Sequence, residues 1–114
     1  MDLPIQITFR GMEPSDALEA RIRERAQELT RFYDRIESCR IVVEAGPQHQ
    51  HRGRLRHLVI HLVVPGGEVV VNRDPAEHHA HEDVYVAIRD AFDAARRQLE
   101  DHVRRLRGDV KSHK

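Results

Sequence analysis

The sequence predicts an α+β domain in which two helices cover one face of a four-stranded sheet, in the order β-α-β-β-β-α. Near the N-terminus apolar and polar residues alternate, a period of two that is typical of a half-buried strand. Two longer segments place apolar residues three and four positions apart, which is typical of amphipathic helices. Between them, two apolar segments flank a Pro-Gly-Gly sequence, which indicates a β-hairpin.

The first half of the chain should form a strand, a helix and a second strand. Residues 3–9 alternate in polarity, and Gly11 ends this strand. Ser15 is the expected N-cap of the helix, because its hydroxyl can accept a hydrogen bond from a free amide of the first turn. Residues 40–45 then form a short strand. The apolar stripe of the helix comprises Leu18, Ile22, Ala26, Leu29 and either Phe32 or Tyr33.

The middle of the chain should form a loop and a hairpin. Residues 46–56 are polar and contain glycine, so we expect a loop whose positive charge comes from Arg52, Arg54 and Arg56. Residues 57–74 carry two apolar runs, and Pro65-Gly66-Gly67 forms the turn between them.

A second helix should run from about Asp83 to near Leu106 and close the domain. We expect Asp83 to be its N-cap, because a carboxylate there can accept hydrogen bonds from free amide groups. Its apolar stripe is spaced three and four residues apart, as in the first helix. We therefore expect a single domain over residues 1–107 and a disordered tail over residues 108–114.

Charge and cysteine content exclude several classes of protein. The 114 residues include 19 Lys+Arg, 19 Asp+Glu, nine histidines and one cysteine. The single Cys39 cannot form an internal disulfide and cannot build a zinc site based on several cysteines. No apolar run approaches the roughly 18 residues of a membrane span, and the N-terminus has no apolar signal core. We expect a cytoplasmic protein with no membrane partner.

The histidines before the second helix are weak candidates for a metal site. His78, His79 and His81 are close in sequence, but adjacent residues of an extended chain point in opposite directions. No H-E-x-x-H spacing is present, although His57 and His61 should lie on one side of a strand. A solvated loop explains these residues better than a metal site, so we expect no cofactor.

The sequence does not favour an enzyme. There is no G-x-S-x-G elbow, and Pro65-Gly66-Gly67 is a turn between strands, not a glycine-rich loop that opens a helix. Cys39 could in principle pair with a histidine, but with nine histidines such a pairing carries little information. We therefore expect a non-enzymatic protein.

Arginine dominates the cations, since lysine occurs only at positions 111 and 114. Arginine forms planar, bidentate contacts with phosphate, which suits an RNA surface, although a GC-rich genome would give the same bias. Acids four residues from an arginine also fit an ordinary solvated helix. Such pairs are Arg89 with Asp93, Asp93 with Arg97, Glu100 with Arg104, and Asp101 with Arg105.

The chain resembles the ribosome hibernation-promoting factor and ribosome-associated inhibitor family, also called sigma-54 modulation proteins. The resemblance depends on "QITFRGMEPSDAL", on "RFYDRIESCRIVVE" and above all on "HEDVYVAIRDAFDAARRQL". It implies a double-stranded-RNA-binding-like fold, with Tyr85 and Ile88 anchoring the second helix on the sheet.

The same resemblance implies a function. The protein is expected to bind the small ribosomal subunit and its ribosomal RNA in the decoding channel, and so to inhibit translation under stress or in stationary phase. Its contacts would read RNA shape and backbone. The expected RNA-binding residues are Arg25, Arg31 and Arg97, followed by Arg21, Arg89, Arg96, Arg104 and Arg105.

The chain departs from the family pattern in two respects. Glu28, Ala94 and Asp101 stand where relatives often carry lysine, which lowers the local positive potential. We expect no second domain after residue 107, so the chain resembles the short forms, and pairing of ribosomes would need a separate dimerising factor. The alternative function is that of a divergent, non-ribosomal member that binds a metal or a protein through its histidine-rich loops.

Overall fold

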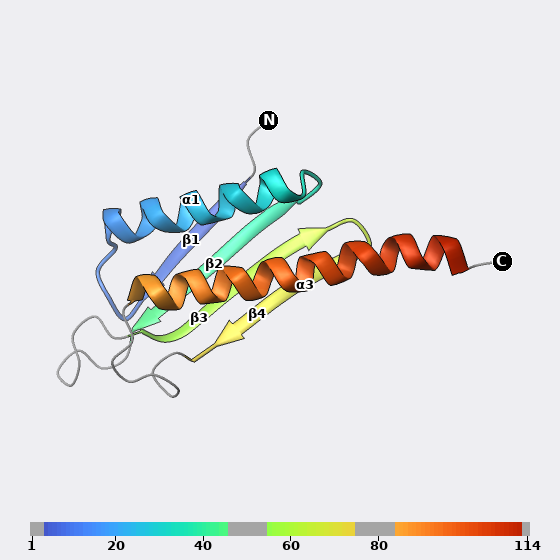
Figure 1. Ribbon diagram of the computed structural model, residues 1–114. Coiled ribbons are helices and arrows are strands. Elements are labelled where there is room, and N and C mark those ends of the chain that lie inside the picture. Colours follow the sequence, from blue (N-terminus) through green and yellow to red (C-terminus); the bar gives the residue numbers. More distant parts are fainter. Residues whose placement is uncertain (1–3, 46–54, 75–83, 113–114) are drawn as a thin grey trace.

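The computed structural model describes residues 4–45, 55–74 and 84–112, which form one sheet covered on one face by two helices (Figure 1). The predicted β-α-β-β-β-α order and α+β class are confirmed. The elements are β1 (Ile5–Arg10), α1 (Asp16–Phe32), β2 (Ser38–Ala45), β3 (Leu55–Val64), β4 (Gly67–Arg73) and α3 (Val84–Ser112).

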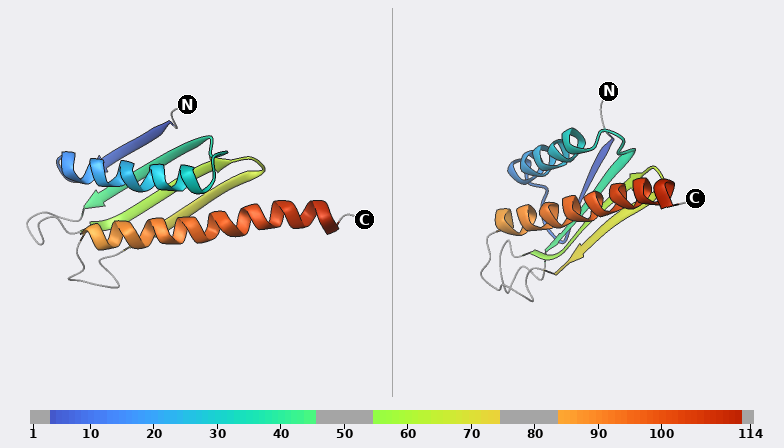
Figure 2. Two further views of the ribbon diagram at one scale, coloured as in Figure 1. Left: turned by 45° about the horizontal axis from the view of Figure 1, so that its top comes forward. Right: turned by 45° about the vertical axis from the view of Figure 1, so that its right-hand side comes forward.

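The sheet has the strand order β1-β2-β3-β4, with β1 parallel to β2 and the other pairs antiparallel. α1 is the crossover between the two parallel strands, so it runs antiparallel to both. β4 has the direction of β2, and α3 returns across the sheet from the end of β4. The two helices are therefore parallel, and their C-terminal ends lie at the same end of the molecule (Figures 1 and 2).

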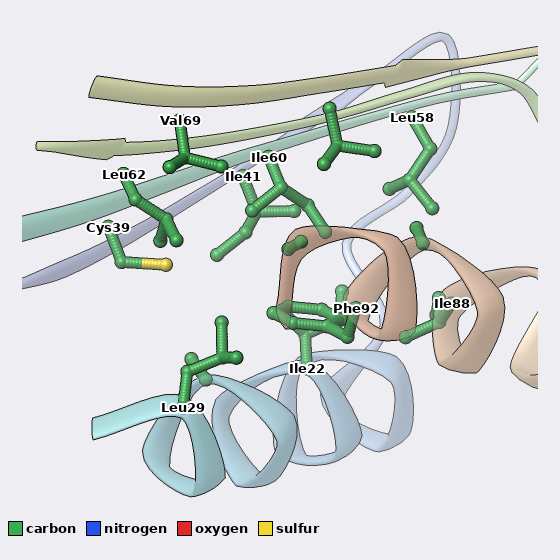
Figure 3. Packing of buried hydrophobic residues seen from close by; sticks show 14 of the residues in the cluster. Ile22, Leu29, Cys39, Ile41, Leu58, Ile60, Leu62, Val69, Ile88 and Phe92 are labelled. Atoms are coloured by element: carbon green, nitrogen blue, oxygen red, sulfur yellow. The ribbon is translucent and has the colours of Figure 1, made fainter. Parts of the chain in front are cut away.

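The core lies between the helices and the inner face of the sheet (Figure 3). Strand alternation directs Ile41, Ile60 and Leu62 inward, where each is fully buried. Ile22 of α1 and Ile88 of α3 meet them from the helix layer. Both predicted apolar stripes are confirmed, and burial of these side chains is the main force that holds the two layers together.

α1 begins where the sequence predicts. The hydroxyl oxygen of Ser15 accepts a hydrogen bond from the amide of Leu18 (3.2 Å), and Asp16 and Glu19 lie in the first turn. At the other end, the Tyr33 amide donates to the Leu29 carbonyl oxygen (2.8 Å). Tyr33 packs partly against the core, whereas Phe32 remains 37% exposed.

The β3–β4 turn is docked on α3. Gly66 follows Pro65, as in a type II turn, and its φ is 84°. Residues other than glycine rarely adopt this angle. The His102 Nε2–H donates to the Pro65 carbonyl oxygen (2.9 Å), and Leu106 lies directly against Gly66. This contact fixes the second half of α3 relative to the sheet.

Several element bounds differ from the prediction, and β2 begins at Ser38, two residues before the predicted start. β3 begins at Leu55, so Arg56 belongs to this strand, while Arg52 and Arg54 lie outside the described residues. α3 continues to Ser112, beyond the end expected near Leu106. Gly108 does not stop the helix, because an internal glycine weakens a helix by about 1 kcal/mol but removes no hydrogen bond. The domain boundary at residue 107 stays a prediction.

The outer face of the sheet is mixed in character. His57 is hydrogen-bonded to Asp74, and His61 to Glu68. Both histidines lie on one side of β3, as predicted, and Val70 beside them is 47% exposed. No helix within the described ranges is long and apolar enough to cross a bilayer.

The central role of the inner sheet face can be tested with Leu62, which is fully buried. Leu62→Ala is expected to lower the free energy of unfolding by about 2–5 kcal/mol, because it removes buried methyl groups and leaves a cavity. Urea unfolding followed by circular dichroism measures this change. The matched control is Val70→Ala on the outer face, with an expected loss of about 1 kcal/mol or less. Equal losses would contradict the assignment of the two faces.

Candidate nucleic-acid interface

Positive charge accumulates where the two helices end. In α1, residues 16–30 carry three arginines and four acids, whereas residues 31–35, at and just after its C-terminal end, carry two arginines and one acid. In α3, residues 84–95 carry one arginine and two acids, whereas residues 96–107 carry five arginines and two acids. Because the helices are parallel, these two arginine-rich segments form a single region, which we call the cationic end.

Five of the eight predicted RNA-binding arginines form ion pairs with neighbouring acids. These partners hold the guanidinium groups on the protein surface and reduce the local positive potential. None of the four expected pairs forms: Arg89 contacts Asp90 and Arg104 contacts Asp101, while Arg97 and Arg105 have no ion pair among the described residues. The five pairs are Arg21–Glu24 (3.4 Å), Arg25–Glu28 (3.5 Å), Arg89–Asp90 (3.2 Å), Arg96–Glu100 (3.7 Å) and Arg104–Asp101 (3.2 Å).

The other three predicted arginines, Arg31, Arg97 and Arg105, have no ion pair within the part of the chain that the structure describes. The same holds for Arg35 and Arg107, which were not among the predicted contacts. All five are exposed and lie in the cationic end. Arg107 could have been found from the thickening of charge along the second helix, but the position of Arg35 requires the parallel arrangement of the helices.

Two arginines bind an aromatic ring of the opposite helix. The Arg21 guanidinium on α1 lies 5.4 Å from the ring centre of Tyr85 on α3. The Arg96 guanidinium on α3 lies 4.6 Å from the ring centre of Phe32 on α1. Each such cation–π contact contributes about 0.5–1 kcal/mol at an exposed site. Arg21 and Arg96 therefore stabilise the pairing of the helices, whatever else they bind.

This arrangement corrects the expected role of Tyr85. The prediction that Tyr85 anchors the second helix on the sheet is wrong, because its side chain is 37% exposed and lies next to Ala17 and Ala20 of α1. Ile88, which is fully buried, does contribute to the core. Helical spacing places Tyr85 at the edge of the apolar stripe, and an aromatic residue at that edge can point toward a neighbouring helix.

A pocket lies between the two helix ends, within the cationic end. Its volume is about 760 Å³. It is lined by residues 31–35, at and just after the end of α1, and by Val103, Leu106 and Arg107 of α3. We call it the end pocket. It brings together Arg31, Arg35 and Arg107, which have no ion pair among the described residues, with the rings of Phe32 and Tyr33.

The histidines give no support to a metal centre within the described ranges. His78, His79, His81 and Asp83 lie outside those ranges. Among the residues that the structure does describe, no group of three or more potential ligands comes together. His57 and His61 face the same way but are each bound to a carboxylate of their own.

Cys39 is buried in the core beneath α1 (Figure 3). Burial raises the pKa of the Cys39 thiol from its ordinary value of 9.0 to about 12, because the thiolate would lose its hydration. The group is therefore a neutral, apolar side chain near pH 7, and it is not an activated nucleophile.

The fold and the cationic end define a small α+β protein with an arginine-rich surface at one end. Comparison with known proteins agrees, since the family described as sigma 54 modulation protein / S30EA ribosomal protein matches residues 5–107. The chain belongs to this family. The predicted resemblance is confirmed, and with it the expectation of a non-enzymatic protein.

Two curated relatives are ribosome hibernation factors. The chain is 31% identical over 94 residues to the ribosome hibernation promotion factor of Deinococcus radiodurans, and this match covers 82% of the chain but 46% of the relative. It is 30% identical over 100 residues to the ribosome hibernation promoting factor of Azotobacter vinelandii, covering 88% of the chain and 82% of the relative. The chain thus spans about half the length of the first relative.

Two solved structures share the fold. The N-terminal domain of Thermus thermophilus Protein Y superposes with a TM-score of 0.65 at 22% identity, covering 90% of this chain and 99% of that one. A ribosomal subunit interface protein from Coxiella burnetii gives a TM-score of 0.65 at 17% identity, covering 88% and 97%.

The buried state of Cys39 leads to a prediction about thiol chemistry. At pH 8 the folded protein is expected to react with a disulfide reagent such as DTNB only after unfolding in urea, because the thiolate is disfavoured and inaccessible. The release of the coloured thiolate product measures the rate. As a control, Val70→Cys combined with Cys39→Ala places the thiol on the exposed sheet face and should react at once. Rapid reaction of native Cys39 would contradict the prediction.

Proposed function

We propose that this protein binds the small ribosomal subunit at its decoding region, through phosphates of ribosomal RNA, and blocks translation in stress or stationary phase. Three facts support the proposal. The chain belongs to the family described as sigma 54 modulation protein / S30EA ribosomal protein. Two relatives are named ribosome hibernation factors. A protein with the same fold is named a ribosomal subunit interface protein.

The observation that carries the proposal is the clustering, at one end of the molecule, of five exposed arginines that have no ion pair with any residue that the structure describes. A guanidinium group that has no acid partner can meet a phosphate without first breaking a contact, and its planar donors fit phosphate oxygens. The formal net charge of zero therefore does not describe the surface that would face RNA. Local positive potential governs the association.

The mechanism is steric occupancy, which needs no chemical turnover. The Cα atoms extend over 59 × 31 × 17 Å, so the molecule is a thin, elongated slab. Such a slab can fill a groove between RNA helices while its arginines contact the backbone on either side. Contacts of this kind read the shape and charge of RNA more than its base sequence.

The paired arginines remain available, although at a lower affinity. Exposed ion pairs contribute about 0–1 kcal/mol and weaken with salt, so a phosphate can replace the carboxylate. Arg25 illustrates the effect, because the Glu28 carboxylate lies 3.5 Å from its guanidinium. The acids on the two helices thus lower the affinity for RNA without removing the interface.

The role of the unpaired arginines can be tested by co-sedimentation with purified small subunits over a range of salt concentrations. Arg31→Gln combined with Arg97→Gln is expected to weaken binding and to lower the slope of log affinity against log salt by roughly one per lost phosphate contact. The control is Arg23→Gln, because Arg23 is already held by Glu19 at 3.1 Å. A wild-type protein that stays in the supernatant at low salt would refute the proposal.

The effect of the acids can be tested in the opposite direction. Glu28→Gln is expected to tighten binding to small subunits several-fold at low salt, because it releases Arg25 for phosphate and removes a nearby negative charge. The matched control is Glu19→Gln, which changes the net charge equally but releases Arg23 instead. Equal gains for both variants would show that net charge alone matters and that Arg25 is not at the interface.

A further inference from the structure

We propose that the end pocket binds one unstacked nucleotide, with its base against Phe32 and its phosphate at the three arginines of the lining. The inference deepens the proposed function and rests on it in naming RNA as the source of the nucleotide. Three features carry it: an exposed ring, three lining arginines that have no ion pair among the described residues, and the polarity of the helix end that lines the pocket.

Phe32 offers a surface for stacking. Its side chain lines the end pocket and is 37% exposed even though Arg96 covers part of the ring. Arg96 does not line the pocket, so the guanidinium and a bound base would use different parts of the ring. Stacking of a base on an aromatic side chain tolerates any base, because every base has a π face. Tyr33 and Leu106 add further apolar surface beside the ring.

The helix end explains why a nucleotide fits better than a bare anion. The last turn of a helix has carbonyl groups without helical partners, and it carries the negative end of the helix dipole. The end pocket is lined by the last turn of α1, so the part next to the helix end disfavours a phosphate and favours the N–H groups of a base. The phosphate belongs beside Arg31, Arg35 and Arg107, which line the same pocket.

The size of the end pocket agrees with this ligand. Its volume of about 760 Å³ lies within the roughly 300–1,000 Å³ that is common for small-molecule sites. Asp34 is the one acid in its lining, against three arginines. The lining therefore keeps a positive charge that can hold a phosphate next to the stacked base.

The opposite end of the helix pair provides an internal comparison. There, a second pocket of about 550 Å³ is lined by Tyr85, Arg21, Glu24 and two alanines. It also has an exposed ring beneath an ion-paired arginine, but the one arginine in its lining is this same Arg21, which is bound to Glu24 at 3.4 Å. With its cation neutralised, this pocket should not bind a nucleotide. Comparison of Phe32 with Tyr85 thus tests whether nucleotide binding requires both an exposed ring and an arginine that is not held by an acid.

The experiment uses tryptophan fluorescence, because the chain has no tryptophan of its own. Phe32→Trp preserves the stacking surface and places a single fluorophore in the end pocket, and Tyr85→Trp does the same in the comparison pocket. AMP is expected to bind the Phe32→Trp protein at least fivefold more tightly than ribose 5-phosphate or inorganic phosphate, as measured by quenching of its tryptophan fluorescence. The Tyr85→Trp protein should show no saturable quenching. A short single-stranded RNA should bind the Phe32→Trp protein more tightly than AMP.

Further variants, made in the protein without an introduced tryptophan, assign the contacts. Their binding of AMP is measured by NMR titration of the amide chemical shifts. Phe32→Ala is expected to weaken binding at least fivefold, whereas Tyr85→Ala should not. Arg107→Gln should weaken binding more than Arg105→Gln, because Arg105 does not line the end pocket. Thermal unfolding of each variant shows whether the fold persists, and Phe32→Trp keeps the test valid even if Phe32→Ala unfolds.

Several results would overturn the inference. Equal binding of AMP and inorganic phosphate would reduce the end pocket to an anion site. Equal quenching in the two tryptophan variants would show that the unpaired arginines are irrelevant, and tighter binding of AMP than of RNA would overturn the assignment to RNA. If the protein sediments with small subunits but AMP does not bind, this inference alone fails. If AMP binds but the protein does not sediment with small subunits, the proposed function fails instead.

Discussion

The parallel arrangement of α1 and α3 is the constraint on which the rest of the structure depends. Because β1 and β2 are parallel, the connecting helix must run opposite to both, and the β2–β3–β4 meander brings the second helix back in the same direction. Both helices bury one apolar stripe against the same sheet face, so their order is fixed by the core. Antiparallel helices would place Arg31 and Arg107 at opposite ends, and neither the cationic end nor the end pocket would exist.

Local patterns in the sequence were sufficient to predict the elements, but they could not predict which arginines are unpaired. The strands, the Ser15 cap and both helical stripes follow from periodicity and from hydrogen-bonding chemistry. Pairing is different, because an arginine has several acids within reach. Arg104 has both Glu100 and Asp101 within one turn, and the choice between them depends on rotamers and neighbours. The exposed rings were also missed, because a residue at the edge of a stripe can face either the sheet or the next helix.

The acids along the two helices adjust the interface instead of abolishing it. In the first halves of the helices, acids outnumber arginines, and each arginine there has an acid partner. Toward the helix C-termini the balance reverses, and in the last turn of α1 the helix dipole offsets part of the repulsion among neighbouring guanidinium groups. Arg31, in the last turn of α1, therefore stabilises its own helix while its charge remains available to a polyanion. A structural role and a binding role coincide at this position.

The same polarity sets the orientation of any ligand at the cationic end. The lining combines the last turn of α1 with three guanidinium groups, so a molecule that suits both must carry hydrogen-bond donors for helix carbonyls and negative charge for the arginines. A sulfate or a phosphate alone suits only the arginines, and an uncharged aromatic ring suits only Phe32 and Tyr33. A nucleotide joins a planar base carrying N–H groups to a phosphate through one flexible sugar, and so it meets both conditions in one molecule. This complementarity, more than the number of arginines, distinguishes the end pocket from the rest of the basic surface.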